Sequence, residues 1–205
     1  SGSVTVNSGS TLSGTGDTGN ASTVNISGTV NPGTAGVGNL TLGATTLNGG
    51  GTLNIQVYSG GGVAGSTGWD LLTTGALTIS STSQTKFNIN LFGITTLTDD
   101  VIGSPGGVFN SSAAKDYEII HASSITGFDS SYFNIVQSNV STAGTWSLTQ
   151  SGNSIYASFS IANIINWNAG ANWDNSSNLG GTGTWSDGLY NWNGNQTAVF
   201  AGTAG

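Results

Sequence analysis

The residues of this sequence that could perform acid–base chemistry are few, and most of them are carboxylates. Asp99–Asp100 and the pair Asp116 and Glu118 are its carboxylate clusters. A glycosidase needs two facing carboxyl groups, roughly 5–9.5 Å apart. Adjacent strand residues face opposite sides, and we expect Asp99–Asp100 in a loop. We therefore interpret these carboxylates as solvated charges and predict no catalytic residue.

A serine–histidine–acid site would have to use His121, the single histidine. No G-x-S-x-G motif accompanies it. His121 follows Ile119 and Ile120 in an expected strand, so we expect it to face solvent or a neighbouring strand. A catalytic triad is recognised by its geometry, which one isolated histidine does not indicate. The sequence thus predicts a protein that is not an enzyme.

Metal ligands are equally sparse, because the chain has one His and no Cys. Zinc is excluded on that ground. Calcium could use carboxylates with Asn and backbone oxygens, but neither an EF-hand loop nor a tandem G-G-x-G-x-D repeat is present. We predict no metal and no cofactor, with structural calcium as the alternative; its candidate ligands are Asp17, Asp99, Asp100 and Asp187.

The only two lysines, Lys86 and Lys115, raise the possibility of a covalent cross-link within the protein. A lysine can form an amide bond with Asn beside an acidic residue, and Lys115 lies near Asp116 and Glu118 in sequence. We favour an exposed salt bridge, since such pairs are common and weak. An intact mass lower by one water or ammonia would reveal the amide bond.

Composition excludes several classes of function. Charged residues make up 5% of the chain, against roughly 25% in typical proteins. A net charge of −7 with two lysines cannot neutralise a phosphate backbone, so we expect no nucleic-acid partner. No apolar run approaches the roughly 18 residues of a membrane span. Abundant Gly, Ser, Thr and Asn without Cys or Met is typical of secreted bacterial surface proteins, so we expect an extracellular location.

The hydrophobic pattern alternates with a period of two, and good helix formers are nearly absent. Residues 1–62 therefore predict stacked short strands separated by Gly, Asn and Ser turns. Leu12, Val30 and Leu47 recur every 17 or 18 residues, a spacing that suits one rung of a right-handed parallel β-helix. An irregular β-sandwich would give similar strings. The predicted class is all-β, with a solenoid in this first region.

The next region, residues 63–161, is richer in large apolar groups. Its alternating runs predict strands at 69–80, 86–92 and 116–125, and QSGNS predicts a hairpin turn within 144–161. We expect a divergent β-rich continuation of the solenoid, or a cap that hides its open edge.

Residues 162–205 form a third region rich in Trp, Asn, Gly and Asp, with a final strand at 197–202. Exposed aromatic rings with polar rims bind sugars, whereas the same rings can form a small core; we favour the core. The candidate contact residues for a glycan or a second subunit are Trp167, Trp173, Trp185 and Trp192.

The segment GTVNPGTAGVGNLTLGATTLNGGGTLNIQV (28–57), followed by WDLLTTGALTIS (69–80), resembles the strand repeats of bacterial autotransporter-associated β-strand repeat proteins. The closing stretch, which begins with NWNAGANWDN (166–175) and continues to the end of the chain, resembles the Trp-rich unit that separates modules in such passenger-like surface proteins. The resemblance implies a right-handed β-helix, export and a role at the cell surface. It brings no catalytic residues.

The two ends of the chain read as halves of one junction. Joined, AVFAGTAG and SGSVTVNSG make one strand–turn–strand, in which Val4, Val6, Val199 and Phe200 would meet. Because the chain starts at Ser1 without Met, we expect a processed piece or a segment of a larger protein. The sequence predicts a repeat unit of a fibre, filament or surface layer that assembles head to tail with itself. The alternative is an adhesin or glycan-binding module.

Overall fold

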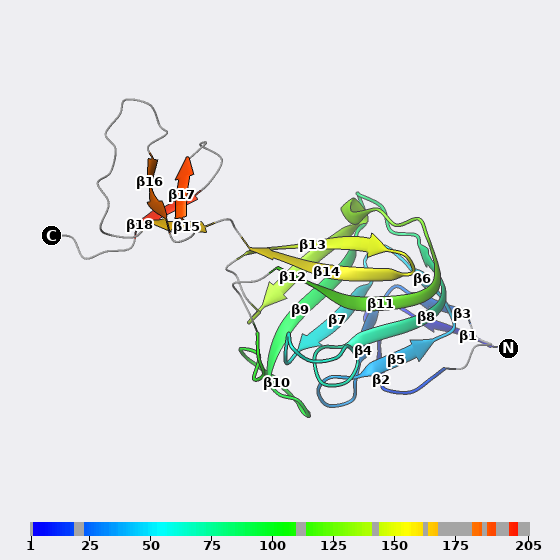
Figure 1. Cartoon of the computed structure of the whole chain (residues 1–205). Coiled ribbons are helices and arrows are strands. Elements are labelled where there is room, and N and C mark those ends of the chain that lie inside the picture. Colours follow the sequence, from blue (N-terminus) through cyan, green and yellow to red (C-terminus); the bar gives the residue numbers. More distant parts are fainter. Residues whose placement is uncertain are drawn as a thin grey trace. The chain divides into compact units, whose positions relative to one another are not determined.

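The computed structural model describes residues 2–18, 23–109, 114–140 and 144–161 with their side chains, and the backbone of four later strands. The chain divides into two compact units, Ser1–Ser160 and Ile161–Gly205. The described elements of each unit are almost all β-strands, which confirms the predicted all-β class (Figure 1). The helical structure of the described residues is one 3-10 turn, η1 (Ser130–Tyr132). Asp129 caps its N-terminus by accepting the Ser131 N–H.

The first unit contains two sheets, and the larger has eight strands. Five of them run parallel in the order β1, β3, β6, β8 and β11, and β5 pairs with the first half of β8. A hairpin of β14 and β13 completes the sheet, with β14 antiparallel to β11. The bounds are β1 (Ser3–Val6), β3 (Thr23–Ile26), β5 (Asn39–Leu42), β6 (Ala44–Leu47), β8 (Leu71–Ile79), β11 (Lys115–Thr126), β13 (Gly144–Ser151) and β14 (Ser154–Ile161).

The smaller sheet has six strands. Four run parallel in the order β2, β4, β7 and β9. The far edge of β9 pairs with two strands, β12 in parallel and β10 in antiparallel orientation. The bounds are β2 (Thr11–Gly14), β4 (Thr29–Pro32), β7 (Thr52–Val57), β9 (Phe87–Thr96), β10 (Asp99–Ile102) and β12 (Phe133–Ser138).

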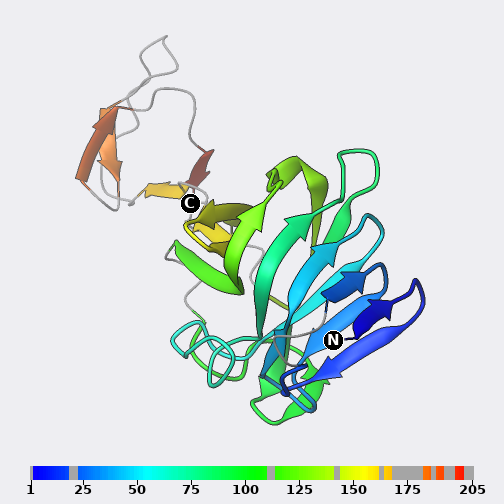
Figure 2. The same cartoon turned by 90° about the vertical axis from the view of Figure 1, so that its right-hand side faces the viewer.

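The chain crosses repeatedly between these two sheets. β1, β3, β6, β8 and β11 of the larger sheet are each followed by a strand of the smaller sheet, namely β2, β4, β7, β9 and β12. Each crossing adds one strand to the same side of each sheet, and Figure 2 shows this succession from blue through green. Both sheets are mixed, because β14 and β10 pair in antiparallel orientation.

Rows of equivalent apolar residues run across the sheets and form the core between them. In the smaller sheet one row joins five strands in register, and its three central members are fully buried; the row is Leu12, Val30, Leu53, Ile89 and Ile135. The larger sheet has the matching row Val6, Ile26, Leu47 and Ile79. Alternation places every second side chain on the buried face, which is the pattern seen in the sequence.

The predicted rung through Leu12, Val30 and Leu47 is half correct. Leu12 and Val30 are register partners in the smaller sheet. Leu47 lies in β6 of the larger sheet, and the next partner of Val30 is Leu53. The chain between β4 and β7 contains both β5 and β6. This crossing is therefore longer than 17 or 18 residues, and residues at that spacing are no longer register partners.

Two further expectations can be compared with the structure. The QSGNS hairpin is confirmed, because β13 and β14 flank a turn at residues 152–153 in which Gly152 has a φ of 55°. The loop expected at Asp99–Asp100 is wrong, since both residues open β10, which pairs with Thr96 and Ile94 of β9. The four residues of β10 are all exposed, so the apolar alternation that identifies a strand is missing there.

The described strands of the second unit form a four-stranded sheet in the order β17, β16, β15, β18. Antiparallel pairing joins β15 (Ile164–Trp167) to β16 (Thr182–Trp185) and β16 to β17 (Gly188–Asn191), and β15 runs parallel to β18 (Thr197–Phe200). Trp167 is the register partner of both Trp185 and Phe200.

Candidate functional site

A pocket of about 210 Å³ lies against the smaller sheet, beside β7 and β10. Its lining includes Asn31, Asn54, Gln56, Asp70 and Asp100. These residues come from β4, β7, β10 and the position before β8, and Ser13 of β2 and Phe92 of β9 also line the pocket. Oxygen atoms of carboxylates and amides are its main polar groups.

Asp70 is the buried carboxylate of this pocket, with 1% of its surface exposed. Its Oδ1 accepts the Gly38 N–H at 2.8 Å, and its Oδ2 accepts the Gln56 N–H at 2.8 Å. Asp70 thereby ties the start of β5 to β7. Burial, assisted by the charge of Asp100, raises the pKa of Asp70 from 3.8 to about 8, although the two N–H donors act to lower it. The energetic cost of an ionised buried carboxylate explains the direction.

Gln56 connects Asp70 with Asp100 at the rim. Its backbone N–H donates to Asp70, and its side-chain Nε2 donates to Oδ1 of Asp100 at 2.6 Å. The same Oδ1 accepts the Gly36 N–H at 2.7 Å. The Gln56 side chain is nearly buried, and its Oε1 accepts no hydrogen bond from the residues that the structure describes. A buried amide oxygen normally has a partner, so this atom is an unused acceptor.

A row of asparagines forms one wall of the pocket. Asn90 donates its Nδ2 to Oδ1 of Asn54 at 2.9 Å, and Asn54 donates to Oδ1 of Asn31 at 2.7 Å. Parallel stacking of β4, β7 and β9 places these three amides in line. Asn31 and Asn54 line the pocket at the end of the row. The amides hold each other in fixed orientations, which makes the wall rigid.

The described residues contain no group of three or more His, Cys, Asp or Glu side chains suited to a metal ion. The pocket has the carboxylates of Asp70, which is buried, and Asp100, which is exposed, together with the buried amide oxygen of Gln56. This arrangement favours a ligand that carries positive charge or donates hydrogen bonds. Neither lysine lines the pocket, so a positive charge on the protein does not compensate Asp70 and Asp100 there.

His121 belongs to a second polar cluster, with Glu118 and Ser154. The Nδ1 of His121 lies 2.9 Å from Oε1 of Glu118 and 3.1 Å from Oγ of Ser154. Ser154 also donates to the same Glu118 oxygen at 2.5 Å. A catalytic triad uses opposite ring nitrogens for the serine and the acid. Here one nitrogen faces both groups and the serine binds the carboxylate directly, which is not the geometry of that relay.

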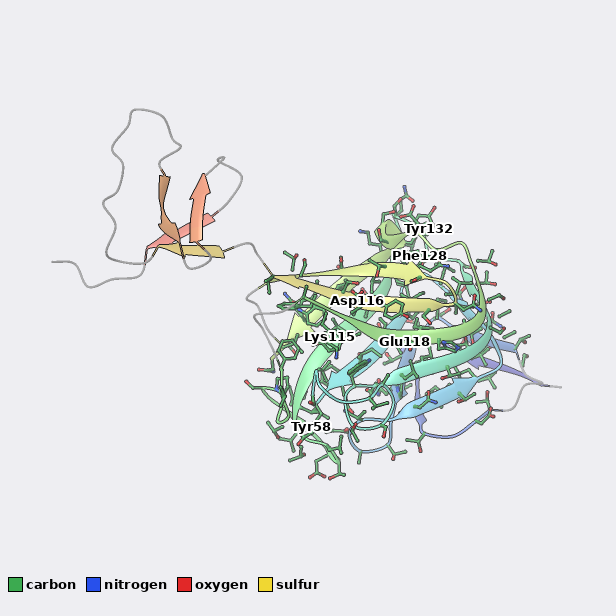
Figure 3. The ribbon with its side chains drawn as sticks, viewed as in Figure 1. Tyr58, Lys115, Asp116, Glu118, Phe128 and Tyr132 are labelled. Atoms are coloured by element: carbon green, nitrogen blue, oxygen red, sulfur yellow. The ribbon has the colours of Figure 1, made fainter. Side chains whose placement is uncertain are left out.

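Lys115, Asp116 and Glu118 follow one another along β11 (Figure 3). The ammonium of Lys115 donates to the Gly60 carbonyl and lies 5.1 Å from the centre of the Trp69 ring and 5.5 Å from that of Tyr117. Its contacts are thus a carbonyl and two aromatic faces, a cation–π arrangement. Among the described residues, Lys115 makes these contacts and no salt bridge with Asp116 or Glu118.

The aromatic residues around Lys115 close one end of the core. Tyr117 packs edge-on against Trp69 with ring centres 5.0 Å apart and stacks on Phe109 at 6.1 Å. Trp146 of β13 packs on Phe159 of β14 at 5.1 Å. Burial raises the pKa of Tyr117 to about 12. This cluster covers the core where the parallel strands give way to the hairpin.

The structure describes only some of the residues that we predicted for glycan contact, for assembly or for calcium binding. Val4 is half-buried and Val6 buried, both in β1, and Val199 and Phe200 belong to β18 of the second unit. Trp167 and Trp185 are opposite each other in β15 and β16. Trp173 and Trp192, and the calcium candidate Asp187, lie outside the described residues. Of the other calcium candidates, Asp100 lines the pocket, whereas Asp17 and Asp99 do not.

Sequence reasoning missed Asp70 and Gln56. The usable signal was a charged residue, Asp70, within the otherwise apolar run WDLL. Nothing in the sequence links it to Gln56 or Asp100, because side chains from different strands meet there.

Comparisons with protein families, with curated proteins and with solved structures give no match to this chain. Among the residues that the structure describes, none belongs to a helix long and apolar enough to cross a bilayer.

Proposed function

We propose that the chain is a structural unit of an extracellular bacterial fibre, filament or surface layer, and that it assembles head to tail with itself. In this proposal the repeated crossing between the two sheets is a right-handed parallel β-helix, as in the autotransporter-associated repeat proteins that the sequence resembles. The protein performs no reaction, and its partner is another copy of the same unit. The single observation that carries the proposal is the character of the four strands that end the parallel series of the two sheets.

These terminal strands are β1 and β13 of the larger sheet, and β2 and β12 of the smaller sheet. Soluble proteins protect such edges with charged residues, proline or strand bulges, since an unpaired edge offers its N–H and C=O groups to another strand. None of these four strands contains a charged residue or a proline; the strand that shares the outer edge of β9 with β12 is β10, which carries Asp99 and Asp100. Edges of this composition suit pairing between subunits.

The directions of the strands at opposite edges agree. β1 and β11 run in the same direction, and β14 runs antiparallel to them. β13 precedes β14 in the chain and forms an antiparallel hairpin with it through a two-residue turn. β13 therefore runs in the direction of β1. In the smaller sheet, β12 runs in the direction of β2 through an unbroken parallel series. A second copy placed end to end would continue both sheets with parallel pairing, and such a heterologous contact generates a filament when it does not close.

The alternative is an adhesin or glycan-binding module that uses the Trp-rich segment. The register of Trp167 opposite Trp185 favours it, because this pairing brings two of the four candidate tryptophans to one place in a sheet. Sugar-binding surfaces use aromatic residues for pyranose faces and polar residues for the hydroxyl groups. In that case the unit would act singly, with surface glycans as its partners.

Negative-stain imaging and light scattering of the purified full chain test the proposal. We expect concentration-dependent filaments or linear oligomers in which the axial repeat equals one unit. Monodisperse single particles up to millimolar concentration, together with quenching of tryptophan fluorescence by glycans, would instead support the adhesin.

A further inference from the structure

We propose that the pocket between Asp70, Asp100 and Gln56 is a binding site for a divalent cation, and that calcium is its ligand. The bound ion would join three stretches of the chain: β7, the position before β8, and β10. This inference concerns the first unit alone and is independent of whether the protein assembles.

The two carboxylates are held beside the same amide. Asp70 accepts the backbone N–H of Gln56, and Asp100 accepts its side-chain Nε2. Each carboxylate oxygen carries two acceptor positions. The hydrogen bonds of Asp70 occupy one position on each of its oxygens, which leaves the others for a ligand. The described hydrogen bonds to Asp100 both end on its Oδ1, and no described residue is seen to donate to its Oδ2.

The Oε1 atom of Gln56 is the independent sign of a ligand. The residue is 8% exposed, and this oxygen accepts no hydrogen bond from any residue that the structure describes. The amide orientation is fixed, because Nε2 must face the Asp100 carboxylate. Leaving such an acceptor buried and unsatisfied costs about 1–3 kcal/mol. A cation in the pocket would use this oxygen together with the two carboxylates.

The available atoms match calcium in chemistry and number. Calcium takes six to eight oxygen ligands from carboxylates, amides and water in flexible geometry, whereas magnesium demands a nearly ideal octahedron. Asp70, Asp100 and Gln56 all line the pocket, and its volume of about 210 Å³ leaves room for several bound waters. The absence of Cys from the chain and of His from the lining argues against softer metals.

Electrostatics favour occupation by a positive charge. Neither lysine lines the pocket, and the chain has a net charge of −7. Asp70 and Asp100 both line the pocket, so their like charges repel each other there. A divalent ion would remove this repulsion. It would also fasten β10, whose residues are all exposed, to the body of the unit.

Isothermal titration of the full chain with CaCl2, after treatment with EDTA, tests the proposal directly. We expect one site in the first unit, and a rise in the unfolding temperature of about 5 °C or more when free calcium is 100-fold above its Kd. MgCl2 at the same concentration should give a much smaller rise. No heat and no shift up to about 10 mM calcium, the weak limit of known calcium modules, would overturn the proposal, and an equal response to magnesium would overturn the assignment to calcium.

Variants locate the site. Asp100→Asn changes an exposed side chain, so the protein should fold, and we expect calcium affinity to fall at least tenfold. Asp99→Asn is the matched control, because it removes the same charge from the neighbouring residue, which does not line the pocket. Calcium binding that is unchanged by Asp100→Asn, or weakened equally by both variants, would place the ion elsewhere and refute the assignment.

Gln56→Glu gives a prediction of opposite sign. A third carboxylate should lower the unfolding temperature in EDTA, because it repels Asp70 and Asp100, and it should strengthen calcium binding. A side chain with a purely structural role would show the first effect without the second. Loss of calcium binding in this variant would contradict a ligand role for the Gln56 oxygen.

Discussion

Asn54 donates its side-chain amide to Oδ1 of Asn31 at 2.7 Å, across the pairing of β7 with β4. Asn54 also accepts from Asn90, so it is the central member of the asparagine row. Its amide therefore satisfies a neighbour on each side, which fixes the wall of the pocket. This relationship depends on parallel register, because equivalent positions of successive strands must lie side by side.

We expect Asn54→Ala to lower the free energy of unfolding by about 1–3 kcal/mol, since it removes two hydrogen bonds and leaves Asn31 and Asn90 without their partner. Urea unfolding measured by circular dichroism provides the value. Asn134→Ala is the control, because Asn134 is exposed and makes one longer amide bond of 3.3 Å to Asn88. A similar loss in both variants would show that the row adds no stability of its own.

The raised pKa of Asp70 predicts that stability falls as pH rises. The folded pKa is about 8 and the usual value is 3.8, so the folded state binds the proton more tightly than the unfolded state does. The contribution of Asp70 is fully present below about pH 4 and is lost progressively up to about pH 8. In EDTA, the unfolding temperature of the wild type should therefore decrease across this window.

Asp70→Asn should remove most of this pH dependence, because the variant has no titrating group at that position. It should also be less stable at about pH 4, since an amide oxygen alone cannot replace both carboxyl oxygens that accept the Gly38 and Gln56 N–H groups. Asp99→Asn should keep the wild-type slope. Equal slopes in the wild type and Asp70→Asn would mean that another group controls the stability in this range.

The core row of the smaller sheet predicts a graded response to truncation. Leu53→Ala removes a fully buried side chain between Val30 and Ile89, and should cost about 2–5 kcal/mol in urea unfolding. Leu12→Ala, in the edge strand β2 of the same row, should cost less because Leu12 is only partly buried. An equal loss at both positions would indicate that the edge of the sheet is as tightly packed as its centre.

The proposed assembly depends on the uncharged edges. Thr5→Lys in β1 combined with Gln137→Lys in β12 introduces charges into exposed edge positions of both sheets. We expect filaments to disappear while the circular dichroism spectrum is retained, because charged edges oppose strand pairing.

Ser66→Lys with Ser8→Lys is the matched control, since it adds two charges to exposed turns instead of edge strands. This control should assemble like the wild type in negative-stain images. Filaments that persist in the edge variant, or that vanish equally in the control, would contradict assembly through these edges.

The expectation that the sequence supported best was the all-β class. Strict alternation in TVNI and TLNI predicted that every second side chain is buried, and these segments of β3 and β7 show it. The hairpin at QSGNS was equally local, because a Gly at positive φ and two alternating runs specify it. β10 escaped prediction because its four residues are all exposed and carry no such pattern.

The sequence by itself determined which faces of the strands are buried, because that follows from a period of two in the apolar residues. It also determined that the segments of β1, β2, β12 and β13 carry no charged residue, because that is a property of residue type. Tertiary structure alone decided which strands are neighbours. The insertion of β5 between β4 and β6 shifts the register, so Val30 meets Leu53 and not Leu47. The same pairing brings Gln56, Asp70 and Asp100 into one pocket from separate stretches of the chain. Local pattern cannot specify such a meeting, since it depends on how many residues each crossing contains.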